Sequence, residues 1–149
     1  RKKADIMTQS QREHTPEIKE ARVLWDCTLG EPDKFALRLD DIRATMDAFE
    51  ARGVKTRFAM VVRGPASKLV MRSPPSQASP DLLQAAGRIA PLLDQLVARG
   101  LMVEQCGMAL VRQGVRREDL LSLVTVIENS FVSIVDYELQ GYAYVPVDR

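Results

Sequence analysis

The sequence has few of the residues on which metal sites and disulfide frameworks depend. It contains two cysteines, Cys27 and Cys106, and one histidine, His14, in 149 residues. Two widely separated cysteines match neither a disulfide framework nor a zinc-binding pattern, and His14 lies in a polar segment without a second ligand at a useful spacing. We therefore expect no metal site and no bound cofactor.

An excess of charge of one sign is also absent. Lys and Arg number 21 against 20 Asp and Glu, which gives a formal net charge of +1. A nucleic-acid-binding protein usually carries a clear basic excess on one face, so we expect no nucleic-acid partner. The strongest apolar run, Phe58–Val62, is only a few residues long and cannot span a membrane.

Several catalytic signatures are missing. The sequence has no Gly-x-x-x-x-Gly-Lys phosphate loop, no Gly-x-Gly-x-x-Gly fingerprint and no Gly-x-Ser-x-Gly elbow. Nucleotide binding of those kinds and a hydrolase triad are therefore unsupported. No apolar signal segment follows Arg1, so we expect a cytoplasmic protein; export is the alternative if a signal segment precedes Arg1.

Strand-like and helix-like segments alternate along most of the chain. A polar N-terminal arm is predicted at residues 1–21, followed by one domain at 22–149. The connections between strands are too long for hairpins, so we expect a three-layer α/β/α sandwich around a mainly parallel five-stranded sheet. The strands are predicted from apolar runs at 23–27, 58–62, 101–103, 124–127 and 142–145. A helix is predicted after the first of them, because one apolar stripe at helical spacing is formed by Phe35, Leu39, Ile42, Met46 and Phe49.

Three local features add to this prediction. Pro91 lies inside a helical pattern and predicts a kink or break near Ala90. Ser130 is placed to cap the helix that follows it, and Pro146 is expected to end the last strand.

Cys106 is the leading candidate for chemistry, because ligands in parallel sheets bind beyond the carboxyl ends of the strands. It ends a predicted strand and precedes a short helix, whose N-terminal amides stabilise a thiolate. Gly107 has no side chain and leaves the sulfur accessible, and it is itself a weaker candidate for ligand binding. The alternative is a small buried apolar residue, since free cysteine is among the most buried residue types.

Weaker candidates follow the other strands. Gly64, in a Gly-Pro turn, can present backbone donors to an anion beside Arg63 and Lys68. Asn129 can hydrogen-bond a ligand. Trp25 alternates toward the sheet interior and is predicted to be core.

The segments Gly100–Leu110, Glu118–Leu120 and Glu138–Tyr144 resemble the DsrE/DsrF-like family. They reproduce a glycine-led apolar strand that ends in cysteine, a short helix and a Gly-Tyr-Ala-Tyr ending. The resemblance covers residues 22–146; the loop at 73–80 departs from it. It implies the sheet order 4-3-2-1-5, a homo-oligomer, often a trimer or hexamer, and for some members a sulfur relay in which a cysteine carries a persulfide.

In that sheet order, one strand separates Cys27 from Cys106, and their sulfurs lie about 10 Å apart. This is too far for a disulfide, so Cys27 is predicted to be structural. An apolar surface is also expected to form a subunit contact. It comprises Met108, Leu110, Val111, Leu120, Leu121, Leu123 and the edge strand at 142–145.

Two hypotheses of function remain open at this point. In the first, the protein is a sulfur carrier or sulfurtransferase-like module that forms a persulfide on Cys106 and acts with a sulfur-donor or acceptor protein. In the second, the same fold is a non-catalytic oligomeric module that binds a small ligand or a partner in the strand-end cleft. The sequence does not decide whether the protein is an enzyme.

Overall fold

Five parallel strands form one sheet in the computed structural model, which describes residues 4–12, 16–74 and 77–149. The strand order is β4-β3-β2-β1-β5 and every neighbouring pair is parallel, which confirms the predicted order. The strands are β1 (Glu20–Cys27), β2 (Lys55–Val62), β3 (Met102–Cys106), β4 (Val124–Ile127) and β5 (Ala143–Val147).

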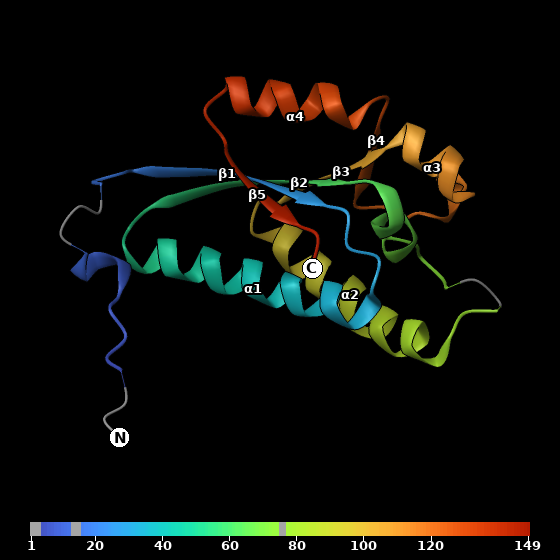
Figure 1. Ribbon diagram of the computed structural model, residues 1–149, viewed down its shortest axis with the longest axis horizontal. Helices are drawn as coiled ribbons and strands as arrows, with labels where there is room; N and C mark the ends of the chain where they lie inside the picture. The colour runs from blue at the N-terminus through green and yellow to red at the C-terminus, as the bar shows by residue number, and fades with distance from the viewer. Residues whose placement is uncertain (1–3, 13–15, 75–76) are drawn as a thin grey trace.

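Helices cover both faces of the sheet, so the three-layer α/β/α architecture is also confirmed (Figure 1). The pair α1 and α2 lies on one face, and α4 lies on the other. The helices are α1 (Pro32–Ala51), α2 (Pro80–Ala98), α3 (Gly107–Gln113) and α4 (Ser130–Leu139), and short 3₁₀ turns occur at Gln9–Gln11, Gly64–Leu69 and Arg117–Asp119.

The larger core lies between the sheet and the α1–α2 layer. The stripe of α1 that its sequence spacing predicts is buried at Phe35, Leu39, Ile42 and Met46. These side chains belong to one cluster with sheet residues such as Phe58. Burial of the stripe fixes α1 on this face, and the opposite face is left for α4.

The period-two alternation of strands places Asp26 and Cys106 on the α4 face. Their neighbours on this face include Leu24, Ala59 and Val61, which form a second, smaller cluster against α4. Asp26 and Cys106 lie at the carboxyl ends of β1 and β3. The strand-end residues of chemical interest therefore meet beside α4.

Two local predictions need correction. The helix α2 is continuous through Pro91, so the break predicted near Ala90 does not occur; Pro91 is on the exposed face, where water can satisfy the backbone carbonyl that loses its donor. Strand β5 continues through Pro146 to Val147. Because β5 pairs only with β1, a residue without an N–H is tolerated on its free edge.

The cap of α4 also differs from prediction. Asn129 has extended backbone geometry, and its side-chain oxygen accepts a hydrogen bond from the Phe131 amide; Ser130 is the first residue inside the helix. At the other end of the chain, β1 begins at Glu20, within the stretch predicted as the N-terminal arm. No helix in the described ranges is long and apolar enough to cross a bilayer.

Candidate functional site

Cys106 lies where β3 turns into α3 and is the N-cap residue of that helix. Cys106 is only 4% exposed, so a reagent can reach its sulfur only through a small opening in the surface. The N-terminus of α3 follows it directly, and the N-terminus of α4, with the buried Ser130, lies on another side. The sulfur therefore faces amides from two helix starts.

This environment favours the thiolate. Burial is the largest single influence and raises the pKa of the Cys106 thiol. Hydrogen bonds from the hydroxyl and amide of Ser130 act in the opposite direction, as do those from the amides of Ala109 and Met108. Together they outweigh burial, and the pKa of Cys106 lies below the ordinary thiol value.

A cavity of about 110 Å³ opens beside Cys106. Its lining includes Gly64 and Asn129, so the structure brings these two predicted residues together with Cys106. The lining also includes Arg63 and Arg112, but not Lys68, which sequence reasoning had paired with Arg63. Drug-sized ligands occupy pockets of roughly 300 Å³ or more, so this cavity suits only a small group.

Gly107 does not line the cavity, and its role is packing. A Cβ at this position would lie 3.0 Å from the Ile127 carbonyl oxygen and 3.5 Å from that of Glu128. The missing side chain therefore lets the start of α3 approach the end of β4. This close approach helps to hold the two helix starts around the sulfur.

The other two weaker candidates have structural tasks as well. Gly64 has a φ of 56°, in the left-handed region that glycine adopts without a Cβ penalty, so it turns the chain at the end of β2. Asn129 uses its side-chain oxygen to cap α4, at 3.0 Å from the Phe131 amide nitrogen. The amide NH₂ group of Asn129 is the part of that side chain left for a ligand.

Arg63 is held in place by a buried carboxylate. Its Nε and Nη2 atoms donate to the two oxygens of Asp26, each at 2.9 Å. Asp26 is 2% exposed and also accepts a hydrogen bond from the Tyr144 hydroxyl of β5. The hydrogen bond with Asp26 raises the pKa of both Arg63 and Tyr144. The Arg63 Cζ atom lies 5.2 Å from the centroid of the Phe131 ring, a cation–π arrangement.

A second buried polar contact connects β3 to the turn after β2. Gln105 is fully buried, and its Nε2 atom donates to Ser67 Oγ at 2.8 Å and to the Cys106 carbonyl at 3.1 Å. Its Oε1 atom has no hydrogen-bond partner among the described residues. The contact fixes the Gly64–Leu69 turn relative to Cys106, so the rim and the sulfur are positioned together.

Sequence reasoning missed how these groups act together. It noted Arg63 beside Gly64, but no local signal in the sequence pairs this arginine with Asp26, which lies near the end of a different strand. It assigned Ser130 to helix capping, whereas Ser130 stabilises the thiolate. Arg112 has no sequence signature beyond its place on the short helix after Cys106.

Cys27 has the environment of a structural cysteine. It is fully buried, and burial, with a smaller contribution from the Asp26 charge, raises its pKa. Both cysteines are free thiols. Trp25 is buried as predicted and packs edge-on against Phe58, with ring centroids 5.5 Å apart. His14 lies outside the described residues, within which no cluster of three metal-ligating side chains occurs.

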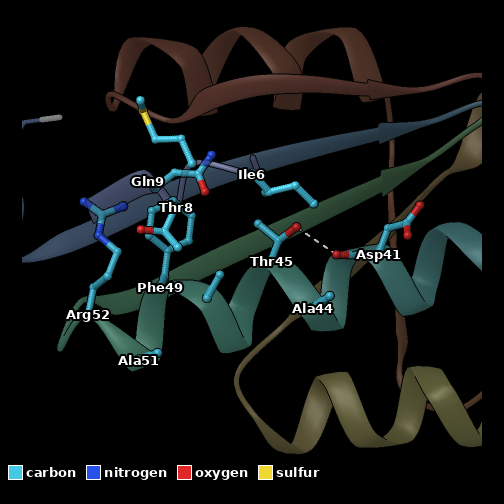
Figure 2. Close-up of a pocket in the computed structure, with 11 residues that line it drawn as sticks. Ile6, Thr8, Gln9, Asp41, Ala44, Thr45, Phe49, Ala51 and Arg52 are labelled. Atoms are coloured by element: carbon cyan, nitrogen blue, oxygen red, sulfur yellow. Dashed lines mark hydrogen bonds between the residues drawn. The ribbon is translucent and has the colours of Figure 1, made fainter. Parts of the chain in front are cut away.

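A larger hollow lies far from this chemistry. It measures about 850 Å³ and separates residues 6–9 from the outer side of α1 (Figure 2). Its wall includes Ile6, Ala44 and Phe49, and the Thr45 hydroxyl there donates to the Asp41 carbonyl at 2.7 Å. No cysteine or histidine lines it, so the reactive group belongs to the smaller cavity.

Comparison with known proteins supports the fold. No family model matches the chain, and no curated protein matches it. The chain is similar to the solved structure of the protein of unknown function MTH1491 from Methanobacterium thermoautotrophicum, with 19% identity and a TM-score of 0.68 over 85% of this chain and 98% of that chain. It is also similar to the ychN protein from E. coli, with 13% identity and a TM-score of 0.57 over 89% and 100% of the two chains. At these identities the likeness extends to the fold alone.

Proposed function

We propose that this protein is a DsrE/DsrF-like sulfur carrier in which Cys106 accepts sulfur as a persulfide. The observation that carries the proposal is the Cys106 thiol itself: it lies between two helix starts, has a lowered pKa and borders a small cavity. The sequence resemblance at Gly100–Leu110 and Glu138–Tyr144 and the fold shared with MTH1491 and ychN support the same family.

The reaction is a thiol–persulfide exchange. The Cys106 thiolate attacks the outer sulfur of a persulfide on a donor protein, a new S–S bond forms, and the donor's own S–S bond breaks. The donor cysteine leaves as a thiolate with the bonding electron pair. Attack by an acceptor thiolate on the outer sulfur of the Cys106 persulfide reverses the exchange and regenerates Cys106.

The residues around the sulfur assist this exchange. Ser130 and the amides of Met108 and Ala109 stabilise negative charge on the Cys106 sulfur before attack and after release. The cavity provides space for the additional sulfur atom. A persulfide-forming thiol is most easily kept reduced in a reducing compartment, which agrees with the expected cytoplasmic location.

The test is persulfide loading followed by intact-mass measurement. Wild-type protein incubated with a low-molecular-weight persulfide donor is expected to gain the mass of one sulfur atom. The Cys106→Ser variant is expected to gain none, and the matched Cys27→Ser variant is expected to load like wild type. Equal loading of Cys106→Ser, or no loading of wild type, would overturn the proposal.

The low exposure of Cys106 favours the second hypothesis, a non-catalytic binding module. The two differ in thiol reactivity under native conditions. A sulfur carrier must react through the cavity, so Cys106 should be modified much faster than the fully buried Cys27. Modification of both thiols only upon unfolding would favour the binding module instead.

We also propose that the protein forms a homo-oligomer, a trimer or hexamer, through α4. Its outward side chains Phe131, Val132, Val135 and Leu139 are 57%, 56%, 55% and 82% exposed. A continuous apolar helix face of this kind is typical of a subunit contact.

The predicted contact surface needs a correction at α3. Met108 and Val111 are exposed, but Leu110 and Leu120 are each 5% exposed and pack in the core of the same protomer. The adjacent turn therefore contributes less apolar surface than its leucines indicate.

A further inference from the structure

The lining of the cavity beside Cys106 contains two arginines, Arg63 and Arg112, and no carboxylate. The carboxylate that pairs with Arg63, Asp26, is not part of the lining. Guanidinium groups in the wall of a small cavity can hold an oxyanion through charge-assisted hydrogen bonds.

Arg63 is pre-organised to bind such an anion. Asp26 occupies its Nε and Nη2 atoms, and Phe131 lies against the guanidinium plane. The two hydrogen bonds to Asp26 use Nε and Nη2, so Nη1 is the guanidinium nitrogen that Asp26 leaves for a ligand. Because the side chain is already fixed, little conformational entropy is lost when Nη1 binds a ligand.

Arg112 supplies a charge that has no ion-pair partner among the described residues. It lies in the last turn of α3, and no ion pair or hydrogen bond within the described part of the chain involves it. Its neighbour Arg116, in contrast, pairs with Asp119 through two contacts of 3.0 and 3.1 Å. The free charge at the cavity is therefore that of Arg112.

The size of the cavity restricts the ligand. A water molecule takes about 30 Å³ of liquid volume, so about 110 Å³ holds only a few waters or one small ion. A whole nucleotide or another large phosphate ester does not fit inside it. We propose that the cavity binds a small oxyanion of the size of sulfate or thiosulfate, with Arg63 and Arg112 as its ligands.

If Cys106 is the sulfur acceptor of the proposed function, the anion site indicates a class of sulfur donor. Besides a persulfide on a donor protein, the site fits a low-molecular-weight donor, a thiosulfonate-type anion in which the transferable sulfur is bonded to an oxidised sulfur. The Cys106 thiolate attacks the outer sulfur of thiosulfate, a new S–S bond forms and the S–S bond of thiosulfate breaks. Sulfite leaves with the electron pair, and Cys106 retains a persulfide anion, so atoms and charge balance.

Binding is tested with sulfate, which cannot transfer sulfur. The rate of Cys106 alkylation is measured with increasing sulfate against chloride of equal ionic strength. Sulfate is expected to slow alkylation with saturation in the wild type, because the anion occupies the route to the sulfur. No saturable difference between sulfate and chloride would overturn the proposed site.

The variants identify the ligands. Arg112→Ala is expected to weaken sulfate protection by about tenfold, the loss of one hydrogen bond to a charged group. Arg117→Ala changes an exposed arginine outside the cavity and is the matched control. Sulfate should protect Cys106 in this variant as it does in the wild type. Arg63→Lys keeps a positive charge beside Asp26 but removes the guanidinium group. It should also weaken the protection of Cys106 by sulfate. Equal protection in Arg112→Ala and Arg117→Ala would exclude Arg112 as a ligand.

Sulfur transfer is tested separately with thiosulfate and with polysulfide. Loading of Cys106 from thiosulfate with release of one sulfite per sulfur supports the donor class. Loading from polysulfide but not from thiosulfate overturns the donor class and leaves the proposed sulfur carrier intact. Loading from neither overturns the sulfur carrier, while the sulfate measurement still decides whether the anion site exists.

Discussion

Arg63 and Asp26 form two parallel hydrogen bonds of 2.9 Å each, which join the carboxyl ends of β2 and β1 on the face covered by α4. Asp26 is almost fully buried, whereas the Arg63 side chain is 28% exposed. The pair thus anchors an arginine whose outer part still reaches the cavity beside Cys106. Structural stability and anion recognition are combined in one side chain.

Removing the arginine should destabilise the fold strongly. Arg63→Ala leaves the Asp26 carboxylate buried without its charged partner, so we expect the free energy of unfolding to fall by about 3 kcal/mol. Urea denaturation followed by circular dichroism measures the change. The control is Arg38→Ala, which removes a surface pair with Asp41 and should cost about 1 kcal/mol or less. Equal losses in the two variants would contradict the anchoring role.

Removal of one hydroxyl should loosen the same pair. Tyr144→Phe deletes the hydrogen bond from β5 to Asp26 and keeps the ring, so stability should fall by about 1.5–3 kcal/mol. Thermal or urea unfolding measures this loss. Tyr142→Phe is the control, because the hydroxyl of Tyr142 does not hydrogen-bond to Asp26. Unchanged stability of Tyr144→Phe would show that the hydrogen bonds from Arg63 alone are enough for the Asp26 carboxylate.

The reactivity of Cys106 should depend on pH in a direction set by Ser130. The lowered pKa means that thiolate is present at a lower pH than in an ordinary cysteine, so alkylation should persist as the pH falls. Ser130→Ala removes one hydrogen bond to the thiolate, which raises the pKa and shifts the rate profile to higher pH. Iodoacetamide kinetics across pH measure the shift, and superimposable profiles would argue against a role for the hydroxyl.

Close approach at Gly107 should make that position intolerant of a side chain. Gly107→Ala places a Cβ 3.0 Å from the Ile127 carbonyl, and we expect a loss of about 1–3 kcal/mol with slower Cys106 alkylation. Gly87→Ala is the matched control in α2, where nothing lies within 4 Å of the new Cβ. It should stabilise the helix by about 0.5–1 kcal/mol. Similar stabilities and Cys106 alkylation rates in the two variants would contradict the packing role of Gly107.

The exposed face of α4 should control assembly. Size-exclusion chromatography with light scattering is expected to give a trimer or hexamer for the wild type. Val135→Asp introduces a charge into the apolar face and should shift the protein toward a smaller species. Glu138→Gln is the control. A wild-type mass near the 16.7 kDa of one chain at every concentration would contradict the oligomer.

Periodicity predicts the elements of this fold better than their ends. The α1 stripe and the apolar strand runs appear as expected, because burial of one helix face or of a whole strand leaves a direct pattern. The order of the strands came from the resemblance. Helix α4 shows the limit: Asn129 and Ser130 are adjacent and both suit a cap, and only the extended backbone at Asn129 decides between them.

The candidate site was predictable only in part. Cys106 stands out because a strand and a short helix meet there, a local feature of the sequence. The bond between Asp26 and Arg63 joins positions far apart in the chain, and the cavity is closed by α4 as well as α3. Contacts between distant elements depend on the packing of the sheet and leave no local pattern.

The place of β5 has a consequence for synthesis of the protein. Strand β1 is the earliest strand of the sheet along the chain, and its outer neighbour β5 is the latest. While the chain grows on the ribosome, that edge of β1 stays unpaired and Asp26 lacks Tyr144. Cys106 and the Asp26–Arg63 pair are therefore synthesised before Tyr144, whose hydroxyl supplies the last of the hydrogen bonds to Asp26.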